Sequence, residues 1–404
     1  MKEFKTLITS QGLYGAVLAT LTFVMIGFFI TKKGLFNKET NGKISKFLLN
    51  WALPFLCIVA FMKNADATNA KEVGVVLGLS TAFYVLIAVY NWAIIKFVPN
   101  MVSAKIKHQA DKMWEQTDKT ENQEKFREAH VASYRQKLMT SQMMIAYGSL
   151  QFFAVPLVSA LTGTNVFNGF STALLQVWNL PYMIGAFTYV QMAYSGQKMS
   201  KDQIKPIMKA LFHPMMICLY VSAILWALQF APVLNTQFVI NPKAPFAEVF
   251  DASKHAGKAH GQFWGGLLGQ LPVIAAILIP GVKIISPLAW LVIGGSLATS
   301  DLKAAAKDGS VWVTTMRKLI TLPLVMFALG FLFVPTKVLS HEAMTLIVLL
   351  AACPPAAVTI IFSVAYKHEH SGYTAQVNSL STLLCLITMP IWVVIAHVSY
   401  VAVV

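Results

Sequence analysis

Long apolar runs recur along the whole chain, and short polar segments separate them. Ten runs of low charge can be read from the sequence, at about residues 12–31, 44–62, 73–98, 145–161, 170–194, 207–230, 284–298, 311–334, 345–366 and 375–401. Most of them are long enough to cross about 30 Å of hydrocarbon as a helix. The runs are continuous and lack the alternating pattern of barrel strands. The pattern therefore predicts an all-α polytopic membrane protein with ten transmembrane helices.

One further apolar run, FWGGLLGQLPVIAAILIP at residues 263–280, allows three interpretations. It can be an eleventh span, a re-entrant segment, or the first half of a broken seventh helix. We favour the broken helix, because residues 284–298 alone are short for the thickness of the hydrocarbon layer.

Composition and charge support this picture. The chain has 404 residues, of which 56% are hydrophobic and 12% charged, about half the charged fraction of a soluble domain. With ten spans and the N-terminus outside, 23 of the 32 Lys and Arg residues fall on the inner side of the membrane. We therefore predict a multi-pass protein of the cell membrane with its N-terminus outside. The net charge of +15 requires no nucleic acid partner, since most of it lies in inner loops.

The sequence lacks the motifs typical of an enzyme. It contains no P-loop, no His-Glu-x-x-His and no arrangement of a nucleophile with its base. The cysteines Cys57, Cys218, Cys353 and Cys385 lie within apolar runs without metal-ligand spacing, and we interpret them as buried small hydrophobic residues without disulfides. The first apolar run lacks a cleavage site and is interpreted as a retained span. We expect no catalytic residue, no metal and no cofactor.

The longest hydrophilic stretch, residues 99–138, carries charges of both signs. Two pairs of opposite charge, Glu115–Lys119 and Glu121–Lys125, have the i,i+4 spacing that supports a helix. We interpret the stretch as a solvated, largely helical cytoplasmic insert. It is either a regulatory element or a surface helix that continues spans 3 and 4, and we favour the surface helix.

The order of features in spans 1–5 returns in spans 6–10. Prolines interrupt apolar sequence at corresponding places in the two halves, namely Pro54 and Pro287, Pro156 and the pair Pro354–Pro355, and Pro181 and Pro390. An odd number of spans in each repeat makes the second half point the other way, so the halves form an inverted repeat. Paired interruptions of this kind point to the binding site of a transporter. The resulting units are spans 1–3 at 1–98, the insert at 99–138, spans 4–5 at 139–200 and spans 6–10 at 201–404.

Three blocks of the sequence carry a resemblance to a known family. They are NGKISKFLLNWALPF, AYGSLQFFAVPLVSALTG and ACPPAAVTIIFSVAYKHEHSGYTAQVNSLSTLLCLITMP. These blocks resemble the auxin efflux carrier family, which includes bacterial carriers of carboxylates such as malate and the plant PIN-type auxin exporters. The resemblance covers nearly the whole chain outside residues 99–138 and 231–262. It implies two inverted five-helix repeats with crossed broken helices 4 and 9. It also implies a scaffold of spans 1, 2, 6 and 7 and a transport unit of spans 3–5 and 8–10.

The chain departs from the pattern of that family in two places. Ser149 stands where Asn is frequent before the span 4 break, with Gln151 two residues further on. His213-Pro214 stands where Asn-Pro is common at the start of span 6, an end that we interpret as structural. The contacts to substrate are therefore expected to differ from those of the auxin exporters.

Acidic residues are missing from the predicted interior of the membrane. None of the 17 Asp and Glu residues lies well inside a span. Cation antiporters with broken helices generally hold the cation on buried carboxylates, so a cation antiporter is less favoured, although backbone carbonyls can bind Na⁺. A helix that is broken within the membrane exposes an N-terminus with roughly half a positive charge. Two such ends favour an anion.

Polar residues near the breaks are the candidates for substrate binding. Gln176 and Asn179 are the strongest, because amides inside the membrane need partners. For each hydroxyl, a bond to its own i−4 carbonyl is an equally good interpretation. For Arg317 and Lys318 we favour two anchors that snorkel to the inner interface over an Arg317 that attracts a carboxylate. The full set is Ser149, Gln151, Gln176, Asn179, Tyr182, Cys353, Ser381, Thr382 and Arg317, with Pro156, Pro354 and Pro355 as the helix breaks.

These observations lead to one preferred function and two alternatives. The preferred function is secondary active transport of small organic anions, with malate-like carboxylates as the first expectation, by an elevator-like form of alternating access. The alternatives are a sodium- or proton-coupled antiporter or symporter of similar fold, and a receptor or sensor that signals through the 99–138 insert. The expected partners are the anion, the lipid bilayer and a coupling proton or sodium ion, and a homodimer remains open.

Overall fold

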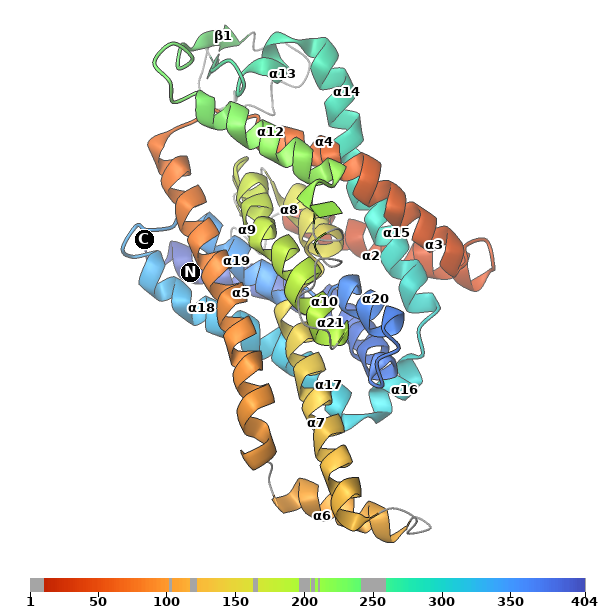
Figure 1. Cartoon of the computed structure of the whole chain (residues 1–404). Helices are drawn as coiled ribbons and strands as arrows, with labels where there is room; N and C mark the ends of the chain where they lie inside the picture. The colour runs from red at the N-terminus through yellow and green to blue at the C-terminus, as the bar shows by residue number, and fades with distance from the viewer. Residues whose placement is uncertain are drawn as a thin grey trace.

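The computed structural model describes most of the chain, namely residues 11–101, 104–116, 122–162, 166–195, 204, 208–209, 211–240 and 259–403. Apart from a two-stranded antiparallel sheet of β1 (Phe238–Ile240) and β2 (Ala259–Gly261), its regular structure is helical (Figure 1). Six of the described helices are long and apolar enough to cross a membrane, at Tyr14–Lys32, Lys38–Ala60, Ala67–Ala93, Pro272–Ala298, Gly309–Phe333 and Ser371–Val401. The prediction of a helical, polytopic membrane protein is confirmed at this level.

Three further apolar helices are too short to cross alone, at Leu150–Leu161, Pro214–Leu228 and His341–Ala352. The count of ten spans is therefore not confirmed and stays a prediction. The N-terminus outside also stays a prediction, since residues 1–10 lie outside the described part of the chain.

The ambiguous run at 263–280 is now resolved. Its second part forms α14 (Pro272–Lys283), which continues through Ile284 into α15 (Ile285–Ala298) as a single span. Pro287 has no N–H to donate to the carbonyl of Lys283, which explains a weak point in the helix at this position. The preferred interpretation of 263–280 as part of span 7 agrees with this arrangement from residue 272 onward.

Three of the prolines, Pro54, Pro156 and Pro323, follow π-helical turns. The turns η1 (Leu48–Ala52), η2 (Leu150–Ala154) and η6 (Arg317–Thr321) are each followed by an α-helix with proline at its second position. These helices are α4 (Leu53–Ala60), α8 (Val155–Leu161) and α18 (Leu322–Phe333). Because proline lacks an N–H, the hydrogen-bond ladder shifts by one residue and the helix remains continuous.

Two groups of helices pack mainly among themselves. In the first, α2 (Gln11–Lys32) lies against α15, and α4 lies against α12 (Pro214–Leu228) and α14. In the second, α5 (Ala67–Met101) packs on α9 (Ser171–Gly185), and α19 (His341–Ala352) packs on α18 and on α21 (Ser371–Val401). Figure 1 shows α12, α4 and α14 together at one end of the molecule.

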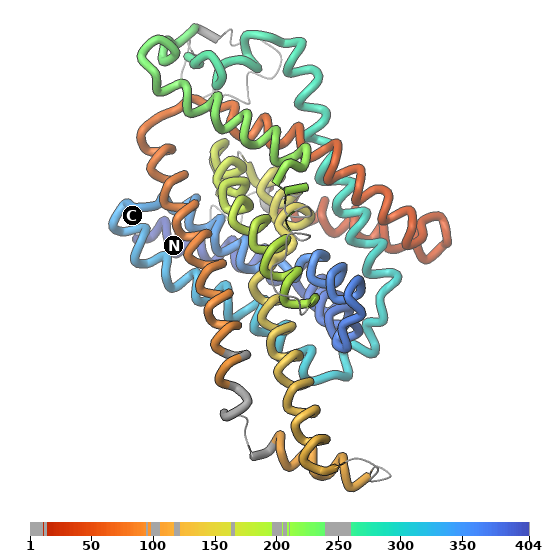
Figure 2. The backbone as a smooth tube through the Cα atoms, in the orientation of Figure 1, coloured from red at the N-terminus to blue at the C-terminus, as the bar shows by residue number. Residues whose placement is uncertain are grey.

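The hydrophilic insert forms a projection from the body. The end of α5, the helix α6 (Ala104–Glu115) and the start of α7 (Gln123–Ala146) extend away from the other helices, as Figures 1 and 2 show. Arg127 binds Asp111 at 2.8 Å, and this guanidinium lowers the pKa of the Asp111 carboxyl. The insert is thus helical where it is described, whereas Lys119 and Glu121 of the expected ion pairs lie outside the described residues.

Candidate functional site

Two interrupted helices meet in the middle of the second group. The first interruption, Tyr147–Ser149, separates α7 from η2, and the second, Cys353–Ala356, separates α19 from α20 (Ala357–Ala365). The N–H of Ser149 donates to the carbonyl of Pro354 at 2.8 Å, and the N–H of Ala356 donates to the carbonyl of Tyr147 at 2.8 Å. Gly148 and Pro355 are the antiparallel partners between them. We call these two paired segments the crossing.

The pairing explains how the protein tolerates broken backbone in a membrane. Irregular backbone exposed to lipid leaves donors and acceptors without partners, at several kcal/mol each. Here each interruption supplies the hydrogen bonds that the other has lost. Neither interruption would be stable at this place without the other.

The second interruption lies where the sequence predicts it. Pro354 and Pro355 lack N–H groups, and a proline also disfavours helical backbone at the residue before it. Cys353 accordingly has an extended conformation, with φ −60° and ψ 142°. The local sequence is sufficient to end α19.

The first interruption lies elsewhere than expected. The chain leaves the helix at Tyr147–Ser149, whereas Pro156 sits in α8 after a π-turn, in a helix that continues. The decisive residue is Gly148, because a Cβ atom there would lie 3.2 Å from Cβ of Cys353 and 3.3 Å from Nζ of Lys318. Glycine at residue 148 thus leaves room for Cys353 and Lys318 beside the first interruption, and Pro156 is corrected from a helix break to a site of a π-turn.

A cluster of three amides lies beside the start of η2. Gln151 is the second residue of η2, and its Nε2 lies 3.5 Å from Oε1 of Gln176 on α9, with Asn179 three residues further along α9. All three side chains are buried. Yet Oε1 of Gln151, Nε2 of Gln176 and both polar atoms of Asn179 have no hydrogen-bond partner. An unpaired buried polar group costs about 1–3 kcal/mol, so such a group needs a ligand or another explanation.

The two helix N-termini at the crossing lack side-chain caps. Neither η2, after Ser149, nor α20, after Ala356, has a side chain that caps its N-terminus. Each such end carries roughly half a positive charge. The amide cluster and the two uncapped ends together form a region that favours negative charge.

Tyr182 lies in an aromatic group next to the crossing. The ring centroids of Tyr84, Tyr147 and Tyr182 are 5.1, 5.6 and 5.9 Å apart. The hydroxyl of Tyr147 is buried without a partner. The structure thus brings Tyr182 toward the crossing as a packed ring, on the same helix as Gln176 and Asn179.

The remaining candidates have local partners or lie at another interface. Cys353 directs its thiol to the carbonyl of Leu349 at 3.5 Å. The hydroxyl of Ser381 donates to Thr315 at 3.1 Å, and the carbonyl of Thr382 accepts from the thiol of Cys385. Ser381 thus contacts α17, the contact of Thr382 stays within α21, and the described hydrogen bonds join neither residue to the amide cluster.

Lys318, and not Arg317, is the basic residue at the crossing. Arg317 is half-buried, and its guanidinium faces the side-chain amide of Gln142 on α7, whose oxygen accepts at 2.9 and 3.2 Å when the amide is turned toward it. Lys318 is only 1% exposed, and its Nζ donates to the carbonyl of Ile145 at 2.9 Å. It lies nine residues beyond the start of α17 (Gly309–Met316), about 13 Å along the helix, which is deep for an interface anchor. This distance from the start of the span is the feature of the sequence that points to a buried Lys318.

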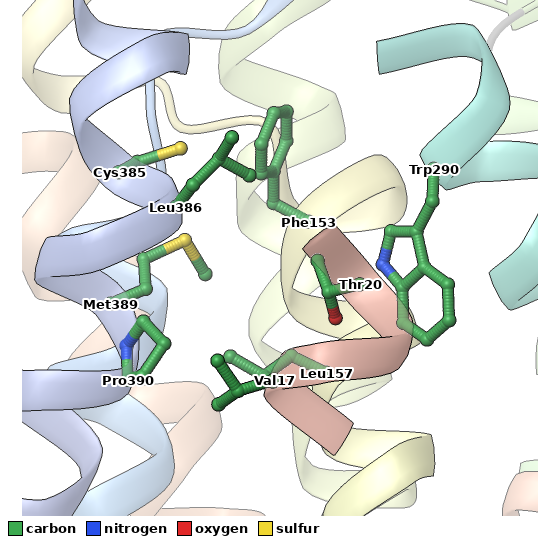
Figure 3. Close-up of a pocket in the computed structure, with 9 residues that line it drawn as sticks. All are labelled: Val17, Thr20, Phe153, Leu157, Trp290, Cys385, Leu386, Met389 and Pro390. Atoms are coloured by element: carbon green, nitrogen blue, oxygen red, sulfur yellow. The ribbon is translucent and has the colours of Figure 1, made fainter. Parts of the chain in front are cut away.

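An apolar cavity lies between the two groups of helices (Figure 3). It is bordered by α2 and α15 on one side and by η2, α8 and α21 on the other. The hydroxyl of Thr20 is already bound to the carbonyl of Ala16 at 2.8 Å, so the walls offer little polarity. The lining residues are Val17, Thr20, Phe153, Leu157, Trp290, Cys385, Leu386, Met389 and Pro390. None of the predicted substrate residues belongs to this lining.

Buried acidic groups are scarce in the part of the chain that the structure describes. Glu72 is the acidic side chain that is buried there, and it accepts from the N–H of Ser340 at 2.8 Å. No group of three or more His, Cys, Asp or Glu side chains that could hold a metal ion occurs among these residues.

Comparison with protein families gives one match. Residues 290–403, about a quarter of the chain, match the Sodium Bile acid symporter family. The matched segment includes Lys318, the second interruption and α21. No curated protein matches the chain. Together with the apolar helices, the match indicates a multi-pass membrane transporter and agrees with the expectation that the chain is not an enzyme.

The match overturns the resemblance to the auxin efflux carrier family. The three blocks that carried that resemblance are apolar segments interrupted by proline. Transporters of different families share broken helices for the same physical reason, so such blocks are poorly specific. The expectation of malate as substrate depended on this resemblance and loses its support.

Proposed function

We propose that this chain is a secondary active transporter that moves an organic anion in symport with sodium by alternating access. The observation that carries the proposal is the cluster of unpartnered amides beside the paired interruptions. Sodium symport is the coupling named by the matched family and is supported by that match alone. The proposal replaces the sequence-based preference for a malate carrier.

The charge of the substrate follows from the region beside the amide cluster. Two uncapped half-helix N-termini supply roughly one positive charge between them. The Nε2 of Gln176 and the Nδ2 of Asn179 lack acceptors, and a carboxylate or sulfonate oxygen would accept from both. A hydrogen bond to a charged acceptor contributes about 1.5–3 kcal/mol, which offsets the cost of keeping these amides buried.

We infer from the apolar cavity that the substrate also has an apolar part. Phe153 and Leu157 line it from the same half-helix that carries Gln151. An apolar group on the anion would pack against such walls, whereas a small dicarboxylate has little apolar surface to bury. Bile acids, which appear in the description of the matched family, are anions with an apolar part.

The proposed architecture retains ten spans in two inverted repeats of five. The short helices before and after each interruption would then combine into spans 4 and 9. The group of α2, α3 (Lys38–Phe47), α4, α12, α14 and α15 would be the scaffold, and the group with α5, α7–α9 and α17–α21 the moving unit. The cavity between the groups is where sliding between them would open or close a path.

The proposal is tested by uptake into proteoliposomes that contain the purified chain. A labelled conjugated bile acid and a labelled aliphatic monocarboxylate are offered under an inward Na⁺ gradient, a choline gradient or a pH gradient. Saturable uptake of the amphipathic anion that is fastest with Na⁺ is the expected result. Absence of saturable uptake for every anion under all three gradients would contradict the proposal. Uptake that depends on the pH gradient and not on Na⁺ would identify the proton as the coupling ion.

The amide cluster gives a prediction with opposite effects on binding and stability. Gln176→Leu and Asn179→Leu should each raise KM by about 10–100-fold, since a charged hydrogen bond contributes about 1.5–3 kcal/mol. The thermal midpoint of Asn179→Leu without substrate should stay the same or rise, because a buried amide without a partner is removed, whereas Gln176→Leu also removes the 3.5 Å contact with Gln151 and should gain less. Uptake kinetics and thermal unfolding in detergent measure the two quantities.

Gln229→Leu is the matched control for these amide variants. Gln229 is equally buried, but its amide donates to the carbonyl of Lys63 at 3.0 Å and accepts from the N–H of Gly265 at 2.7 Å. Its loss should lower the thermal midpoint and leave KM unchanged. Parallel loss of stability and binding in Gln176→Leu would instead indicate a role in folding.

A further inference from the structure

A single ammonium group is buried at the crossing. Lys318 reaches it from η6, which packs against both α7 and α19. Its Nζ donates to the carbonyl of Ile145, in the last turn of α7. Among the described residues no carboxylate forms an ion pair with it. An isolated buried ammonium is unfavourable by several kcal/mol, so its charge must be compensated by other groups.

The ends of two half-helices supply that compensation. The C-termini of α7 and α19 both point toward the crossing, and each carries roughly half a negative charge. Gly148, just after α7, lies close to both the ammonium and the end of α19. A Cβ atom at residue 148 would lie 3.3 Å from Nζ of Lys318 and 3.4 Å from the carbonyl oxygen of Leu350. The two ends sum to about one negative charge, which a single ammonium balances.

Half-helix C-termini of this kind are general ligands for transported cations. In carriers with discontinuous helices, unwound carbonyls and half-helix C-termini hold Na⁺ near the middle of the membrane. We propose that the ammonium of Lys318 permanently occupies the cation locus of this crossing. The chain thus carries there a covalently attached cation in place of a bound one. The inference rests on the proposed function for the coupling ion, and it assigns the coupled sodium to another part of the protein.

The effects of the charge and of the volume of the Lys318 side chain can be tested separately. Lys318→Ala removes the ammonium and leaves room for an ion, whereas Lys318→Met removes the charge and keeps most of the volume. Thermal unfolding of both variants and of the wild type is measured in detergent in NaCl and in choline chloride at equal ionic strength. Arg317→Ala is the matched control, because it removes a neighbouring basic side chain that faces Gln142 and not the carbonyl of Ile145.

The expected pattern differs between the variants. Lys318→Ala should unfold at a lower temperature than the wild type in choline, and Na⁺ should restore several degrees by mass action. Lys318→Met should be destabilised in both salts, and Lys318→Arg should resemble the wild type in both. Neither the wild type nor Arg317→Ala should gain the Na⁺ response of Lys318→Ala.

Two outcomes would overturn the inference. One is a Lys318→Ala protein that responds to Na⁺ no more than the wild type. The other is a Lys318→Met protein that is as stable as the wild type, since the charge would then be dispensable. If Lys318→Ala cannot be purified, the comparison of Lys318→Met with Lys318→Arg still tests whether the charge is required. A Lys318→Met protein as stable as Lys318→Arg would then overturn the inference. Because unfolding needs no substrate, the result is independent of whether the proposed transport is observed.

Discussion

Replacing both Pro354 and Pro355 by alanine is expected to abolish transport while the chain still inserts into the membrane. Alanine supplies the two missing N–H groups, so α19 and α20 can join into one helix of about 37 Å over His341–Ala365. The joined helix would withdraw the carbonyl of residue 354 and the N–H of Ala356 from the crossing. The N–H of Ser149 and the carbonyl of Tyr147 would then lose their partners.

The size of this effect follows from the two lost hydrogen bonds. Each unpaired buried group costs about 1–3 kcal/mol, so the crossing is destabilised by about 2–6 kcal/mol in total. Its occupancy should fall by roughly 30-fold or more, at tenfold for each 1.4 kcal/mol. Initial uptake rates and the amount of inserted protein are measured side by side.

Two single-proline variants serve as controls for this prediction. Pro54→Ala changes the proline after η1, in the first group of helices and away from the crossing, and should keep most of the uptake. Pro156→Ala should also leave the first interruption in place, because that interruption lies at Tyr147–Ser149 and the proline lies inside α8. Uptake at the wild-type rate by the Pro354–Pro355 double variant would refute the role of the crossing.

Gly294→Val is expected to prevent stable folding altogether. A Cβ atom at residue 294 of α15 would lie 2.7 Å from the backbone N of Phe28 and 2.9 Å from the carbonyl carbon of Val24. The same holds for Gly27 on α2, where a Cβ atom would lie 2.9 Å from backbone atoms of Leu291 on α15. Small residues allow such close approach of membrane helices, and backbone atoms on both sides cannot move aside.

The destabilisation by Gly294→Val should be roughly 3 kcal/mol or more, at the upper end of overpacking effects. The measurements are the thermal midpoint and the yield of monodisperse protein in detergent. Gly15→Val on the partner helix α2 is the matched control, since no atom lies within 4 Å of the Cβ position at Gly15. A Gly294→Val protein with the stability of this control would mean that α2 and α15 do not pack as described.

Local sequence was informative wherever one residue type decides the backbone. Pro354 and Pro355 end α19 because they remove N–H groups, and no neighbour is needed for that effect. The amides Gln176 and Asn179 were singled out because an amide in an apolar helix must be buried beside something polar. Both are fully buried, and their substrate role remains a proposal.

The positions of prolines were misleading in two cases, the predicted helix break at Pro156 and the resemblance to the auxin efflux carrier family. A helix absorbs a missing N–H by a π-turn when the rest of the ladder continues, so proline alone does not predict a break. The blocks around these prolines are shared by carriers of different families, and the match to the Sodium Bile acid symporter family corrected the assignment.

The sequence by itself determined that the chain is a helical membrane protein, that its second broken helix is interrupted at Pro354–Pro355, and that buried carboxylates are scarce. Only the tertiary structure decided that Gly148 marks the first interruption and that Lys318, not Arg317, enters the crossing. The reason is that both depend on segments far apart in the chain. The backbone at Gly148 pairs with Pro355, about 200 positions away, and Cys353 leaves little room for a side chain there. Lys318 is buried because the ends of α7 and α19 meet around it.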